Sequence, residues 1–305
     1  YENLTQIEKN KFKKNKQGIN IKPIYHSDDN IKNFNVDFPE SWHIYEFIKV
    51  KNAKKANKIA LNALKNNANG ICFSNPKDLS VLLKDISIEH IRLDFVDYDK
   101  NFPAEWNQFS KNRKIEGAFH GNTNYDTKNF LNSIITEGNT VKEQINSALS
   151  KAKNLKKNYQ FIFEIGSDFF LEIAKIKAFR IIWKEKTGFN PFILSINSLT
   201  NKEAIFPYKN IIKSTTECMA AVFGGTNAMM TLTNSLKLKE SDDFASRICR
   251  NQQVILKKES FFDKIEDPTK GSYFIDYLVN EILKEFNIKK NPSQKKHTST
   301  WKTAE

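Results

Sequence analysis

Short apolar runs alternate with amphipathic segments along most of the chain, and this alternation restricts the fold more than any other feature. The apolar runs have the length of strands, and the segments between them carry apolar residues at helical spacing. Strands that alternate with helices predict β/α units and a parallel sheet. The expected strands are residues 43–50, 70–73, 91–96, 115–119, 133–136, 159–165, 192–196 and 228–232.

The helices expected between these strands complete the same pattern. Eight strands separated by helices favour a closed α/β barrel of the (β/α)8 TIM type, and a doubly wound open sheet is the alternative. The sequence leaves open whether the barrel is complete at its C-terminal end. The expected helices are residues 53–65, 79–84, 105–110, 127–132, 141–153 and 167–183, the last one capped by Ser167.

The stretch 241–276 has the least conformational freedom. Ser241 is a suitable N-cap, and Phe244, Ile248 and Ile255 recur at helical spacing, so a helix is expected to about residue 258. Asp-Pro and a following glycine then predict a turn before the next helix. A polar cluster lies within the first helix among core positions, where polar groups need partners: Arg247, Arg250, Asn251 and Gln252.

In a barrel of this type, chemistry collects where strands end and loops begin, on the C-terminal face. The residues expected there are Lys51, Asn52, His120, Gly121, Asn122, Asn124, Glu137, Gly138 and Asn139. A histidine at a strand end can act as an acid or base near neutral pH. No carboxylate or nucleophile pairs with His120 by motif, so a structural hydrogen bond is the favoured interpretation of this residue. No ligand spacing indicates a metal site.

Charge and cysteine content bound the class of protein. The formal net charge of +13 raises the idea of a nucleic-acid or membrane partner. The lysines are spread along the whole chain without aromatic–basic interleaving, so neither partner is expected. Cys72, Cys218 and Cys249 lie far apart, which favours buried free thiols over zinc or disulfides. With no long apolar run and no charged-then-apolar leader, a cytoplasmic location is expected.

Four blocks resemble the methylmalonyl-CoA mutase family. GINIKPIYHSDD (18–29) resembles its G-I-x-I-K-P-x-Y-x-x-x-D segment, and FEIGSDFFLEIAKIKAFRIIW (163–183) its F-x-x-G-x-x-F-F-x-E-x-A-K-x-x-A-x-R-x-x-W helix. KSTTECMAAVFGG (213–225) is similar to R-T-T-E-x-M-x-A-x-x-G-G, with Lys213 in place of the arginine. The stretch 241–276 resembles the late barrel segment with its R-x-x-R-N-x-Q helix. The resemblance spans about residues 18–276 and implies the barrel fold.

Two departures from the family's large chains are equally informative. The D-x-H-x-x-G motif, whose histidine ligates cobalt in the family, is absent, and NSIITEGNT (132–140) has no histidine where the family's G-Y-H-x-x-E-A-G loop carries one. The resemblance is therefore closest to the small, non-catalytic chain of heterodimeric mutases. It implies a large catalytic partner chain, adenosylcobalamin bound by that partner, and no cofactor, metal or catalytic residue on this chain.

The function expected from the resemblance is support for assembly and stability of the catalytic chain, which isomerises methylmalonyl-CoA and succinyl-CoA. The alternative is an acyl-CoA-binding barrel completed by a separate cobalamin-binding chain. The candidate substrate-binding residues are His120, Asn124, Lys213, Arg250 and Asn251. The expected organisation is an N-terminal segment (1–17), the barrel (18–286) and a polar tail (287–305), with no cobalamin-binding domain.

Overall fold

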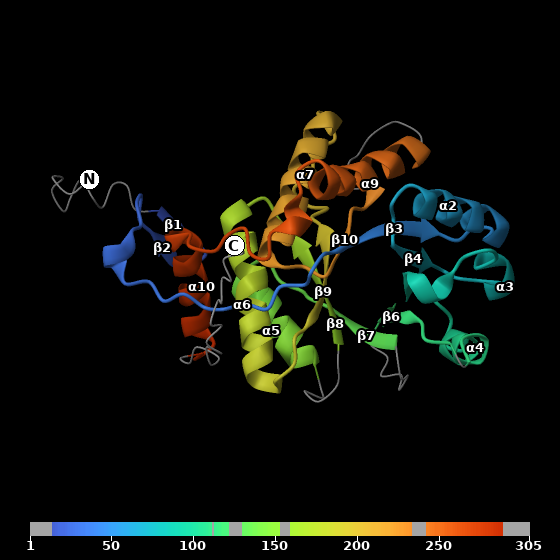
Figure 1. The fold of residues 1–305 in the computed structure, drawn as a ribbon, viewed down its shortest axis with the longest axis horizontal. Helices are drawn as coiled ribbons and strands as arrows, with labels where there is room; N and C mark the ends of the chain where they lie inside the picture. Colours follow the sequence, from blue (N-terminus) through green and yellow to red (C-terminus); the bar gives the residue numbers. More distant parts are fainter. Residues whose placement is uncertain (1–13, 112, 122–129, 153–158, 234–241, 289–305) are drawn as a thin grey trace, which may run out of the picture.

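The fold is a closed parallel barrel. The computed structural model describes residues 14–111, 113–121, 130–152, 159–233 and 242–288. The strands follow one another around the barrel in chain order, and the last pairs with both the first and its predecessor (Figure 1). The prediction of a (β/α)8 barrel is thus confirmed, and the open sheet is wrong. The barrel strands are β3 (His43–Lys49), β4 (Gly70–Ser74), β5 (Arg92–Val96), β6 (Glu116–His120), β7 (Phe130–Ile135), β8 (Tyr159–Ile165), β9 (Phe192–Asn197) and β10 (Ala228–Met230).

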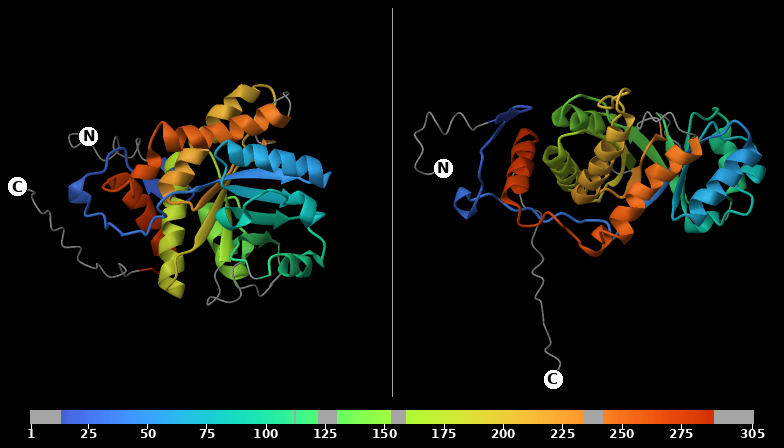
Figure 2. Two further views of the ribbon diagram at one scale, coloured as in Figure 1. Left: turned by 45° about the vertical axis from the view of Figure 1, so that its right-hand side comes forward. Right: turned by 90° about the horizontal axis from the view of Figure 1, so that it is seen from above.

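Helices surround the barrel, and one further helix lies outside that ring (Figure 2). The ring contains α2 (Ala53–Lys65), α3 (Leu79–Leu82), α4 (Phe102–Phe109), α5 (Val141–Lys151), α6 (Phe169–Thr187), α7 (Pro207–Gly224) and α9 (Asp242–Lys258). The outer helix is α10 (Tyr273–Glu285), and the short elements are β1 (Lys14–Lys16), β2 (Ile19–Ile21), η1 (Ser27–Asp29), η2 (Ile88–His90) and η3 (Phe262–Lys264). Asn52 is the N-cap of α2, where its side chain accepts from Lys55 N at 3.0 Å.

Two local predictions were wrong. The helix expected at 127–132 fails at Phe130, where β7 begins, and residues 127–129 lie outside the described part. A strand inside a barrel tolerates polar residues such as Asn132 and Ser133, which weakened its apolar signal. Ser167 does not cap α6, because Asp168 occupies the N-cap position and makes no side-chain cap bond. The Ser167 hydroxyl instead accepts from Asn201 Nδ2 at 2.7 Å.

The buried face of α9 also differs from the expectation. Ile255 is 53% exposed and Phe244 and Ile248 are half-buried, whereas Ala245, Cys249 and Leu256 are buried. The expected N-cap Ser241 lies outside the described residues. The helix therefore packs on the barrel with a face that combines small and polar side chains with Leu256, whereas Phe244 and Ile248 are only half-buried and Ile255 is exposed.

Helix α6 is enclosed on both sides, by the barrel and by α10 (Figure 1). Its buried run from Leu171 to Trp183 includes three cations. Lys175 Nζ donates to Gln144 Oε1 and Glu164 O, at 2.8 and 2.7 Å. Burying a charge without a partner is very costly, so α6 can be buried on both sides only because its cations have these hydrogen-bond acceptors. The other two cations, with their acceptors, are Lys177 (Asp267, Thr269) and Arg180 (Asp37 O, Gly225 O, Asn227).

The stretch 14–42, which precedes the first barrel strand, crosses the outer face of α10 and connects this helix to the barrel (Figure 1). The Tyr25 ring lies 4.7 Å from that of Tyr277, whose hydroxyl donates to Asn20 O at 2.7 Å. Cys72, Cys218 and Cys249 are all buried and free, as expected. Within the described part of the chain, no helix is both long and apolar enough to cross a membrane.

Candidate functional site

A cavity of about 770 Å³ opens at the C-terminal mouth of the barrel. Apolar side chains line its depth, including Cys72, Ile162, Ile196 and Met230. Three lysines line the side formed by the end of β3 and the start of α2: Lys49, Lys51 and Lys55. Lys51, Asn52 and His120, expected from their positions after strands, all line this cavity. Asp97 and Asp243 also line the cavity, so the positive charge is confined to the β3–α2 side. An apolar hollow with one cationic side suits an amphipathic anion.

A chain of buried polar side chains begins at the cavity and continues down the barrel axis. His120 Nε2 lies 2.7 Å from Asp94 Oδ2, and because a carboxylate only accepts, Nε2 carries the proton. Gln160 Nε2 also donates to Asp94 Oδ2, at 2.5 Å, and the Tyr45 hydroxyl donates to Oδ1 at 3.0 Å. Asp94 is completely buried. One carboxylate therefore connects three strands besides its own.

The electrostatics of Asp94 follow from these contacts. Burial alone would raise its pKa, but the hydrogen bond and charge of His120, with Arg92 and Gln160, outweigh burial and hold the pKa below its usual value. Asp94 is therefore a carboxylate whose charge is balanced inside the barrel. This carboxylate holds the Nε2 side of the His120 ring.

Arg92 completes the chain at the opposite end of the barrel. Its Nε donates to the Tyr45 hydroxyl at 3.3 Å, and its Nη1 donates to Glu116 Oε2 at 3.0 Å. The guanidinium carbon lies 3.9 Å from the centroid of the Phe192 ring. The Tyr45 ring fits because residue 70 is glycine: a Cβ there would lie 2.4 Å from the ring. Buried side chains thus fill the axis from the N-terminal end to the floor of the cavity.

Arg250 and Asn251 do not reach the cavity. Arg250 Nη1 donates to Glu46 Oε2 at 2.9 Å, and Glu46 projects from β3 to the helical side of the sheet, opposite to Tyr45. Ser246 also donates to Glu46. Burial raises the pKa of Glu46 to about 7, although Arg250 acts in the other direction. Asn251 is exposed. Arg250 therefore ties α9 to β3 in the barrel wall.

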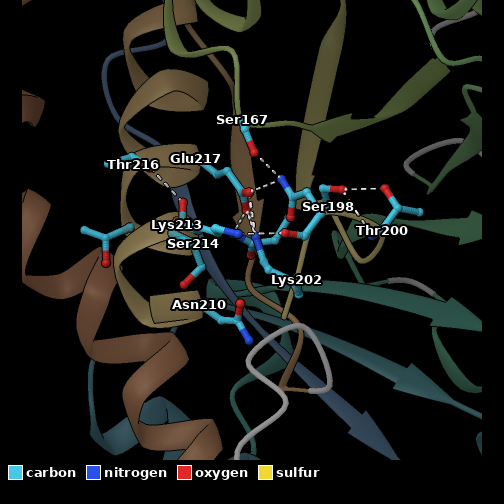
Figure 3. Close-up of polar contacts among 12 residues, drawn as sticks. Ser167, Ser198, Thr200, Lys202, Asn210, Lys213, Ser214, Thr216 and Glu217 are labelled. Atoms are coloured by element: carbon cyan, nitrogen blue, oxygen red, sulfur yellow. Dashed lines mark hydrogen bonds and ion pairs between the residues drawn. The ribbon is translucent and has the colours of Figure 1, made fainter. Parts of the chain in front are cut away.

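Lys213 belongs to a different polar cluster, which joins α7 to the β9–α7 loop (Figure 3). Its Nζ donates to Glu203 Oε1 and Asn201 O, at 2.7 and 3.0 Å. Beside it, Lys202 Nζ contacts both oxygens of Glu217 at 2.5 and 2.6 Å, with both side chains buried. Lys213 is occupied by loop contacts where the family's arginine would stand. Asn124 lies outside the described residues.

Of the candidate binding residues that the structure describes, His120 is the one that lines the cavity. The substrate-binding role assigned to the candidates stays a prediction. Sequence reasoning missed Asp94 and Gln160, although a signal exists: Arg92 and Asp94 alternate within an apolar strand and must therefore share one face. Glu137 and Gly138 line a separate hollow beside α5. Among the described residues, no group of three or more His, Cys, Asp and Glu side chains is arranged to hold a metal.

Comparisons with known proteins agree with the motifs. The family model of methylmalonyl-CoA mutase matches residues 133–289. The "Methylmalonyl-CoA mutase small subunit" of Porphyromonas gingivalis is 33% identical over 165 residues, covering 51% of this chain and 27% of that protein. The Escherichia coli methylmalonyl-CoA mutase is 35% identical over 158 residues, covering 47% of this chain and 22% of that protein. The mitochondrial methylmalonyl-CoA mutase of Homo sapiens is 36% identical over 135 residues, covering 40% of this chain and 18% of that protein.

The chain thus spans about a quarter or less of the length of these curated relatives. The match to the family model covers just over half of the 305 residues and runs from β7 to the end of α10. It includes three of the four sequence blocks that carry the resemblance. On this evidence the chain belongs to the methylmalonyl-CoA mutase family.

Proposed function

We propose that this chain is a non-catalytic small subunit of an adenosylcobalamin-dependent methylmalonyl-CoA mutase, where it supports assembly and stability of the catalytic large chain. The observation that carries the proposal is the filled barrel axis, in which Tyr45, Arg92, Asp94 and Gln160 are buried. The similarity to a small subunit from Porphyromonas gingivalis points in the same direction.

The filled axis matters because an enzyme must hold its substrate in a fixed geometry for reaction. A substrate group that entered the barrel would have to displace Asp94 or one of its partners. Leaving one member of a buried ion pair without its counter-charge costs about 3–5 kcal/mol. Substrate binding along the axis would therefore be opposed by the barrel's own packing.

The residues at the mouth also do not suit a corrin cofactor. Within the described residues, His120 is the histidine that lines the cavity, and its Nε2 is bound to Asp94 at 2.7 Å. Only 7% of the His120 surface is exposed and its ring is held to Asp94 within the barrel, so this side chain would have to leave that contact to meet a corrin above the mouth. We therefore assign adenosylcobalamin to the partner chain in this proposal.

The proposal is tested by co-expression with the large subunit from the same source. The complex is purified through a tag on this chain, and cobalamin-dependent mutase activity is compared for the complex, this chain alone and the large chain alone. We expect the two chains to co-purify and activity to need the large chain. Activity of this chain alone with added cobalamin would overturn the proposal.

The mouth cavity favours a second candidate, an acyl-CoA-binding barrel that works with a separate cobalamin-binding chain. Its apolar depth could receive an acyl group, while Lys51 and Lys55 attract phosphates. Calorimetric titration with methylmalonyl-CoA tests this candidate. It requires Lys55→Ala to weaken binding and Lys58→Ala, an exposed change on the same helix outside the cavity, to leave binding unchanged. The absence of binding by the wild-type chain would exclude it.

A further inference from the structure

Exposed apolar side chains cluster where the β9–α7 loop enters α7. Ile205 is 83% exposed, Ile212 68%, Tyr208 61% and Phe206 53%. Tyr208 and Ile212 are one turn apart on the same face of α7, and Ile205 and Phe206 directly precede that helix. Contiguous exposed apolar patches of this kind mark interaction sites on soluble proteins. We call these four residues the α7 patch.

The loop beneath the α7 patch is fixed by buried polar contacts (Figure 3). The Lys202–Glu217 ion pair is fully buried, and Asn201 Nδ2 donates to Glu217 Oε1 at 2.8 Å. Asn210 bonds the backbone of Glu203 twice, accepting from its N–H at 3.0 Å and donating to its carbonyl at 2.7 Å. The backbone that presents Ile205 and Phe206 is thus held from the α7 side. A pre-organised surface loses less entropy when a partner binds.

Helix α9 fixes the next turn of α7 from the other side. Gln252 Nε2 donates to Ile211 O, Ser214 Oγ and Thr215 Oγ1, at 2.6, 2.7 and 2.8 Å. These contacts leave Ile212 pointing away from α9, with 68% of its surface exposed. The patch is therefore not covered by the described elements that pack on α7.

The charges around the patch decide what kind of partner fits it. Lys209 Nζ lies 4.3 Å from the centroid of the Phe206 ring. The two carboxylates of the stretch 198–217 are occupied internally, Glu203 by Lys213 and Glu217 by Lys202. The patch is thus apolar and cationic. A second copy would bring lysine against lysine, and another +13 of net charge, to the same contact.

We propose that the α7 patch is a docking surface for the catalytic large chain, on a face of that chain that is apolar at its centre and edged by carboxylates. This proposal rests on the proposed function, because that function supplies the partner. Phe206 and Ile212 act as the apolar anchors, and Lys209 supplies the charge contact at the edge.

Binding of purified large chain to this chain, tagged, tests the proposal. We expect the double change Phe206→Ser and Ile212→Ser to weaken binding about 100-fold, because it removes two apolar anchors. The matched control is Phe189→Ser, which changes an aromatic residue of similar exposure, 51%, just after the end of α6 at the opposite end of the barrel. The control should bind like the wild type. Far-UV circular dichroism melting shows whether each variant is folded.

A charge change provides a second readout. Lys209→Glu should weaken binding about 10-fold at low salt and less at high salt, because it opposes the partner's carboxylates. Lys270→Glu, which makes the same change on an exposed residue in the turn before α10, should have little effect.

The outcomes separate the two proposals. If the wild-type chain binds the large chain and the folded Phe206→Ser, Ile212→Ser variant binds equally well, the docking surface is wrong and the subunit role stands. If the wild-type chain does not bind the large chain at all, both proposals fall. If sedimentation shows a dimer of this chain alone that the double variant abolishes, the occupant is a second copy and the assignment to the large chain is overturned.

Discussion

The molecule buries charge in two regions, and the two regions handle it differently. In the outer layer, Lys175, Lys177 and Arg180 of α6 each reach two or three acceptors. On the barrel axis, Arg92 Nη2 and Gln160 Oε1 are buried and find no hydrogen-bond partner within the described structure. The buried cations of the outer layer all have hydrogen-bond acceptors, whereas the axial network contains buried polar atoms without a partner.

The difference shows which network depends on a single residue. Each α6 cation has its own acceptors, so a change at one of them leaves the others in place. On the axis, His120, Tyr45 and Gln160 all converge on Asp94. The loss of Asp94 would therefore leave several buried groups unpaired at once, while the loss of one α6 cation leaves one set of acceptors unpaired.

The largest effect is expected at Asp94. Asp94→Ala should lower the free energy of unfolding by about 4 kcal/mol, because His120, Tyr45 and Gln160 lose their shared buried acceptor and Arg92 loses a nearby buried carboxylate. Urea denaturation measures this loss. Asp99→Ala, which removes an exposed carboxylate in the loop after β5, should cost less than about 1 kcal/mol. Similar losses in the two variants would mean that the axial network does not converge on Asp94.

Arg180 tests the satisfied network. Arg180→Met should cost about 3 kcal/mol, because it leaves the buried carbonyl of Gly225 without this donor and removes one of the two donors to Asn227 Oδ1. The control is Lys184→Met, one turn further along α6, which breaks a more exposed ion pair with Asp37 and should cost less than about 1 kcal/mol. An Arg180→Met loss larger than that of Asp94→Ala would reverse the ranking of the two networks.

The Glu46–Arg250 contact should make stability depend on pH. Burial raises the pKa of Glu46 to about 7 from a usual value of 4.5. The pKa of Glu46 is higher in the folded chain than in the unfolded chain, so folding favours the protonated side chain. The stability that comes from this preference is fully present below about pH 4.5 and is lost as the pH rises towards 7. The wild type should lose about 3 kcal/mol between pH 4.5 and pH 7.5 relative to Glu46→Gln, in which this residue does not titrate. Parallel urea titrations of both proteins at these pH values measure the difference. Parallel pH profiles would show that Arg250 keeps Glu46 ionised throughout.

The sequence predicted the barrel well because strand–helix alternation is a local signal repeated many times. The bounds of α2 and β8 agree with their expected limits. The axial network was not predicted, because a polar residue inside a strand carries no sign of its partners. Asp94 meets His120 and Gln160 only after three strands have closed around the axis. The position of Lys51 and His120 at the mouth of the barrel was predicted correctly, because residues at the C-terminal ends of parallel barrel strands all lie on the same face.

Helix α9 shows the limit of apolar spacing as a guide. Ile255 has the spacing of a core residue, yet it is exposed, while Gln252 and Gln253 are buried. The buried face is determined by what the helix meets, namely the polar groups of α7 and Glu46 of β3. Intrinsic spacing cannot contain that information. Arg250 and Asn251, which are adjacent and equally matched to the family motif, consequently lie in opposite environments.

Asn251 carries the smallest expected effect and tests this last point. Asn251→Ala should change the free energy of unfolding by less than about 0.5 kcal/mol, because the side chain is exposed and alanine favours a helix. Thermal and urea unfolding of the isolated chain measure it. A loss of more than about 1 kcal/mol would mean that Asn251 is covered in the isolated chain, as Arg250 is. The outer face of α9 would then belong with the buried networks, and the contrast between its two adjacent motif residues would disappear.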